Sequence, residues 1–177
     1  RQSQIITTNT YASSRIMLKS AGFEKRFEEI NIKAVNSALK AREETGYKDV
    51  IIAGSISHRY PIADGDTKSN ASIQVSKLEL QEATEEMALL LTNNGCDVIL
   101  LEMMYRPERM KIIFDIVKKL NIPIWVCFSC RKSDKGEILS LTDETVVPFS
   151  EMIAISKEYN FGAWGIMHKS EDILGEV

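Results

Sequence analysis

Short apolar segments rich in β-branched residues alternate along this chain with longer segments of helical periodicity. Five such segments are nearly continuous in hydrophobic residues: "QIITTN" (4–9), "DVIIAG" (49–54), "DVILLE" (97–102), "IPIWVCFS" (122–129) and "FGAWGIM" (161–167). Uninterrupted apolar strands are typical of parallel sheets covered on both faces. Strand, helix and strand in repetition predict an α/β fold with right-handed crossovers.

Four helices are expected between these strands. The first carries apolar residues three or four apart over 23–41. The second begins at Ser76, which with Glu79 matches a capping box, the third begins at Pro107, and the fourth covers about 148–159. None of the strands precedes a Gly-rich phosphate loop, which an open nucleotide-binding sheet would usually show. This favours a closed barrel over an open sheet.

The composition and net charge are those of an ordinary globular protein. A net charge of -3 with 44% hydrophobic residues indicates neither a nucleic-acid partner nor a membrane protein, and we expect a cytoplasmic location. Three cysteines, an odd number, predict free thiols. The 177 residues are fewer than the roughly 250 of a complete eight-stranded barrel. We therefore expect a chain truncated at both ends, or open strand edges covered in a homo-oligomer.

In a barrel of parallel strands the chemistry gathers where the strands end. Thr8, Asn9 and Tyr11 follow the first strand and are candidates for hydrogen bonds to a small polar ligand, or else cap and turn residues. Glu102 ends the third strand, where a carboxylate needs a partner: a ligand ammonium, or a structural ion pair with Arg106 or Arg109. Ser129, at the end of the fourth strand, is a further candidate for substrate contact.

Metal ligands are sparse in the sequence. Cys127 and Cys130 form a C-x-x-C, but within a strand these side chains face opposite sides and lie too far apart for a disulfide. His168 ends the last strand and could meet Cys130 and His58, three residues from three loops. This spacing alone does not define a zinc site.

Several motifs taken together resemble the homocysteine S-methyltransferase family, zinc-dependent (β/α)8 barrels related to betaine-homocysteine methyltransferase. They are "IITTNTYASS", "DVILLEMM", "IPIWVCFSC" and "GIMHKS", in the family's order over essentially the whole chain. The resemblance implies that residues 1–177 form a single TIM-barrel-type domain covering strands two to six. It also implies methyl transfer from a sulfonium or betaine donor to homocysteine, giving methionine. In that scheme Glu102 holds the amino group of homocysteine, and the segment from Thr8 to Tyr11 lines the same pocket.

The resemblance fails at the family's metal ligands. Three cysteines hold zinc in the family, and this chain has Met167 and His168 at the Asn-Cys pair that supplies the first. The Cys-Cys pair supplying the other two has no counterpart before Val177. His168 is thus the candidate metal ligand, and the cofactor, zinc in the family, is left open. The alternatives are a divergent homologue that binds an amino-acid-like ligand without catalysing the transfer, or a metal-independent enzyme with Glu102 as base and His168 as acid.

Overall fold

A six-stranded sheet forms the centre of the molecule in the computed structural model, which describes residues 3–61, 73–141 and 146–167. The strands are β1 (Ile5–Thr7), β2 (Ile51–Ser57), β3 (Val98–Met104), β4 (Ile124–Lys132), β5 (Ile138–Ser140) and β6 (Ala163–Met167). Five of them are parallel and adjacent in chain order, β1-β2-β3-β4-β6, while β5 pairs antiparallel with the far end of β4. The predicted parallel α/β arrangement is confirmed.

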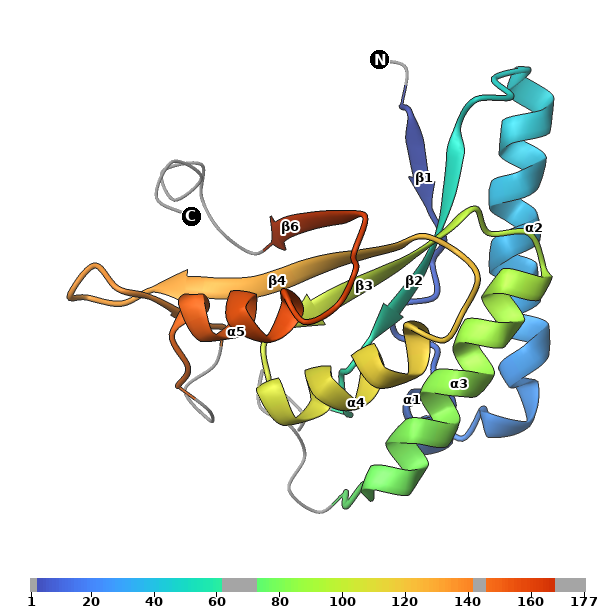
Figure 1. The fold of residues 1–177 in the computed structure, drawn as a ribbon. Helices are drawn as coiled ribbons and strands as arrows, with labels where there is room; N and C mark the ends of the chain where they lie inside the picture. The colour runs from blue at the N-terminus through green and yellow to red at the C-terminus, as the bar shows by residue number, and fades with distance from the viewer. Residues whose placement is uncertain (1–2, 62–72, 142–145, 168–177) are drawn as a thin grey trace.

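Helices follow the strands and gather on one side of the sheet (Figure 1). They are α1 (Arg15–Ser20), the short 3-10 helix η1 (Glu24–Arg26), α2 (Phe27–Thr45), α3 (Lys77–Asn93), α4 (Pro107–Val117) and α5 (Phe149–Ser156). The predicted capping box is present in α3, where the Ser76 hydroxyl accepts from the Glu79 N–H (3.1 Å) and Glu79 accepts from the Ser76 N–H (2.8 Å). None of the helices in the described ranges has the length and apolar character to cross a membrane.

The hydrophobic core lies between the sheet and these helices. Side chains that alternate toward the helices, such as Ile52, Leu101 and Val126, are completely buried. Helix α3 approaches β2 so closely at Gly54 that an added Cβ would lie 3.0 Å from the Cys96 sulfur and 3.2 Å from Leu91. Glycine at this position therefore permits the helix to pack directly on the strand backbone.

The opposite side of the sheet carries no helix in the described structure (Figure 1). Ile51, Leu100, Glu102, Trp125 and Cys127 alternate toward it and are only partly buried. We call this side the open face. In a closed barrel it corresponds to the interior, where side chains from successive strands form layers.

Three strands extend further than the sequence suggests. Strand β2 continues to Ser57, beyond the segment 49–54 expected from the sequence, because Ile56 still packs into the core. Strands β3 and β4 continue to Met104 and Lys132. Helix α1 and the β4-β5 hairpin have no counterpart in the sequence prediction, since both elements are too short for a clear periodicity.

Candidate functional site

The carboxyl ends of β1, β2 and β3 meet at one rim of the sheet. Ser57, the last residue of β2, is the register partner of Glu102. The Ser57 hydroxyl also donates to the Tyr11 carbonyl at 2.8 Å. Tyr11 and Glu102 therefore lie at the same rim, with Ser57 between them, as the parallel strand order predicts.

The segment after β1 uses its polar groups mainly to attach itself to β2. The buried Thr8 hydroxyl accepts from the Ser55 N–H (3.2 Å), and the Thr10 hydroxyl donates to the Ser55 carbonyl (2.8 Å). Asn9 is exposed to solvent. The Tyr11 hydroxyl contacts the guanidinium of Arg59. Thr8, one of the three predicted ligand-binding residues in this segment, thus has a structural role, because its hydroxyl holds the segment against β2.

The carboxylate of Glu102 lies half-buried on the open face. Within the described residues no cationic side chain is within ion-pair distance of it. Burial raises the pKa of the Glu102 carboxyl, and the neighbouring Ser55 hydroxyl partly opposes the rise. That hydroxyl is itself buried and has no hydrogen bond of good geometry to any residue that the structure describes. Two polar groups without a full set of partners therefore lie side by side.

The two arginines considered as structural partners of Glu102 are engaged elsewhere. The guanidinium of Arg109 stacks on Tyr60, 3.4 Å from the ring centroid, and donates to the His58 carbonyl at 3.3 Å. The guanidinium of Arg106 lies 3.9 Å from a carboxylate oxygen of Glu108. The described structure therefore contains neither of the two ion pairs that could have explained Glu102 as a structural residue.

Ser129 lies on the strand next to Glu102 and on the same face. It is completely buried, and its hydroxyl donates to the Met103 sulfur at 3.4 Å. On its other side it is the register partner of Met167 in β6. The sequence indicates Ser129 but not Ser55, Ser57 and Met103. The two serines follow the segment 49–54 expected to be a strand, and a methionine in an apolar strand gives no signal of a site.

The two cysteines of the C-x-x-C face opposite sides of β4, as predicted. Cys130 is buried in the core, while Cys127 is half-buried on the open face, and neither forms a disulfide within the described residues. Cys127 lies over Gly165 of β6, where an added Cβ would be only 2.8 Å from the Cys127 sulfur. Burial, and then the negative charge of Glu102, raises the pKa of the Cys127 thiol.

A complete zinc site is not formed by the described residues. They contain no cluster of three or more His, Cys, Asp or Glu side chains able to hold a metal ion. His168, the candidate ligand, lies outside the described residues. The other two residues considered with it are separated, because Cys130 is in the core and the buried His58 ring packs against Tyr105. The described residues alone therefore do not supply the three ligands of the zinc site expected from the family.

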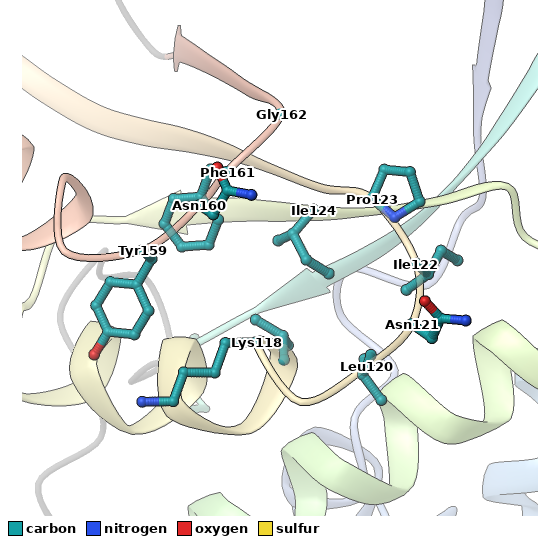
Figure 2. Close-up of a pocket in the computed structure, with 11 residues that line it drawn as sticks. Lys118, Leu120, Asn121, Ile122, Pro123, Ile124, Tyr159, Asn160, Phe161 and Gly162 are labelled. Atoms are coloured by element: carbon teal, nitrogen blue, oxygen red, sulfur yellow. The ribbon is translucent and has the colours of Figure 1, made fainter.

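A separate hollow of about 460 Å³ lies at the other end of the sheet, where β4 and β6 begin (Figure 2). Its walls include Ile124, Tyr159 and Phe161, and the two aromatic rings stack with their centroids 5.6 Å apart. The amino ends of barrel strands serve stability rather than chemistry. We therefore place the candidate site at the rim that carries Glu102.

Solved structures with the same arrangement of strands and helices are known. The homocysteine methyltransferase MmuM from Escherichia coli matches with a TM-score of 0.72 in its metallated form and 0.71 in its oxidised form, both at 21% sequence identity. Each match covers 92% of this chain, whereas the chain spans only 57% and 56% of the two MmuM chains. The fold is thus of the TIM-barrel type.

Two sequence comparisons were made, one with curated proteins and one with protein-family models. A search among curated proteins gives no match. The family model of homocysteine S-methyltransferases, in contrast, matches residues 1–166, nearly the entire chain. The chain belongs to the homocysteine S-methyltransferase family.

Proposed function

We propose that the protein transfers a methyl group from a sulfonium or betaine donor to the thiol of homocysteine, giving methionine. In this proposal Glu102 binds the amino group of homocysteine at the rim formed by β1, β2 and β3. Family membership supports the reaction class. The Glu102 carboxylate, half-buried and without a cationic partner among the described residues, supports the binding of an ammonium group.

That carboxylate is the observation on which the proposal rests most. A partly buried carboxylate costs free energy unless it is paired. In the described structure Glu102 has no cationic partner, and the adjacent buried Ser55 hydroxyl offsets the rise in the carboxyl pKa only in part and has no hydrogen bond of good geometry to the described residues. A ligand ammonium carries three donors and could bond to both groups at once. An amino acid bound by its ammonium group would therefore complete the hydrogen bonding of this rim.

Activation of the substrate thiol is not explained by the same residues. A free thiol has a pKa near 8.5 and is mostly protonated at neutral pH. The open face disfavours a thiolate, since burial and Glu102 raise the pKa of the Cys127 thiol there. In the family, zinc coordination supplies the deprotonation. The described residues around Glu102 would hold the amino acid, and none of them activates its thiol.

This gap favours a second candidate function. A divergent homologue would bind homocysteine or a similar amino acid at Glu102 without transferring a methyl group. The observation in its favour is that Met167 and His168 stand where the family has the Asn-Cys pair that supplies its first zinc ligand. Both candidates share the binding site and differ only in turnover.

One set of measurements separates the two functions. Purified protein is incubated with homocysteine and either S-methylmethionine or betaine, methionine is measured by mass spectrometry, and zinc is measured in the same sample. Methionine formation that is lost in Glu102→Gln and kept in Glu43→Gln, an exposed carboxylate on α2, supports methyl transfer. Binding of homocysteine without methionine formation supports the second candidate, and the absence of both contradicts each of them.

A further inference from the structure

Strand β3 contains a β-bulge immediately after Glu102. Leu101 is the partner of Val126 and Met104 the partner of Phe128, so β3 advances three residues while β4 advances two. Glu102 and Met103 together therefore oppose the single residue Cys127. Bulges change the direction of side chains and are frequent next to active sites.

The backbone of Met103 is left-handed, with φ at 60°. It is the one non-glycine residue in the described ranges with a positive φ. This conformation is unfavourable for a residue with a Cβ, and it persists only where the surroundings enforce it. Neighbouring contacts do so here: Met103 is buried, and its sulfur accepts from the Ser129 hydroxyl.

The bulge changes which side chains reach the open face. Leu101 and Met104 both pack into the core on the helix side, although an uninterrupted strand would place residues three apart on opposite faces. The two residues between them, Glu102 and Met103, are left together toward Ser129 and the open face. The position of the Glu102 carboxylate thus depends on the extra residue that the bulge inserts into β3.

The bulge also leaves the Met103 N–H outside the regular pairing of β3 with β4. This N–H donates to the Met167 sulfur at 3.3 Å. A thioether is a weak acceptor. The main-chain donor is therefore held on the open face by a contact that an oxygen of a ligand could replace.

We propose that Met103 is a positioning residue whose left-handed backbone holds Glu102, and a main-chain N–H beside it, toward the two ends of an amino-acid ligand. The carboxylate faces the ammonium group of the ligand, and the Met103 N–H faces its carboxylate. The ligand part of this inference rests on the proposed function. The geometric part concerns the protein alone.

The test compares two side chains of similar size that differ in their tolerance of a left-handed backbone. Asparagine adopts positive φ readily, whereas valine is a genuine outlier there. We expect Met103→Asn to keep the affinity for L-homocysteine within about threefold and Met103→Val to weaken it by about tenfold, as measured by calorimetry. Met103→Gly and Met103→Ala form a second pair of the same kind, for use if the valine variant does not fold.

A second readout needs no ligand. The Glu102 carboxyl is titrated by carbon NMR in the parent protein and in each variant. We expect the raised pKa caused by burial of Glu102 to remain in Met103→Asn and to return toward its ordinary value in Met103→Val. Equal carboxyl pKa values and equal affinities in the two variants would overturn the inference.

The two readouts also separate this inference from the proposed function. If the parent protein does not bind homocysteine, the proposed ligand is wrong, and the NMR titration still decides whether Met103 positions Glu102. If the parent protein binds homocysteine but the two variants behave alike in both readouts, the function stands and the positioning role is wrong.

Discussion

Acid should destabilise this fold through one histidine. His58, directly after β2, is completely buried, and neither of its ring nitrogens forms a hydrogen bond with the described residues. Its ring packs against Tyr105 with the centroids 4.6 Å apart. Burial, with added repulsion from the guanidinium groups of Arg109 and Arg106, lowers the pKa of His58 well below its ordinary value. The folded protein therefore keeps this imidazole neutral.

The size of the effect follows from the unfolded state. There His58 takes up a proton as the pH falls below its ordinary pKa of about 6.5. The folded state does not take up this proton. His58 therefore leaves the free energy of unfolding unchanged above about pH 6.5 and lowers it progressively below that pH. The loss is about 1.4 kcal/mol per pH unit, or about 2 kcal/mol between about pH 6.5 and about pH 5.

Urea unfolding of the parent protein and of His58→Phe at several pH values measures this contribution. Phenylalanine keeps a ring against Tyr105 and does not titrate. We expect the free energy of unfolding of the parent to fall relative to that of the variant as the pH drops from about 7 to about 5. All other ionisable groups are common to both proteins, so their effects cancel in the difference. Parallel pH profiles for the two proteins would refute the buried, neutral state of His58.

Three further predictions follow from single contacts. Homocysteine binding should weaken on acidification, at a pH above the range in which a glutamate ordinarily takes up a proton. Burial raises the pKa of Glu102, and the protonated carboxyl cannot pair with an ammonium group. Calorimetry at several pH values measures this change in affinity. Gly165→Ala should destabilise the protein by about 1–3 kcal/mol in urea unfolding, since the new Cβ would meet the Cys127 sulfur at 2.8 Å, and the loss should shrink when Cys127→Ala is added. Ser76→Ala should cost about 1 kcal/mol because it removes the capping box of α3, and an unchanged unfolding midpoint would contradict that role.

Much of the fold could be predicted from the sequence because apolar periodicity and capping signals are local. The five parallel strands and the capped start of α3 are examples. The open face was not predictable in detail, because serines look like loop residues in a sequence. Ser55 and Ser57 belong to β2 and border Glu102 only because their side chains alternate toward that face.

The bulge at Met103 left no trace in the sequence for a different reason. A positive φ at a methionine is imposed by tertiary contacts, here with Ser129 and Met167, and not by local preference. The role of His168 as a candidate metal ligand, the homo-oligomer and the single barrel domain stay predictions. Light scattering of the purified chain checks the oligomer, which a monodisperse monomer would contradict.

Calorimetric titration with L-homocysteine tests the central claim most directly, that Glu102 at the rim of β1, β2 and β3 binds the amino group of an amino acid. The parent protein and Glu43→Gln should bind with equal affinity. Glu102→Gln should bind about 10 to 100 times more weakly, the loss expected for a hydrogen bond between charged groups. Undiminished binding by Glu102→Gln would contradict the claim.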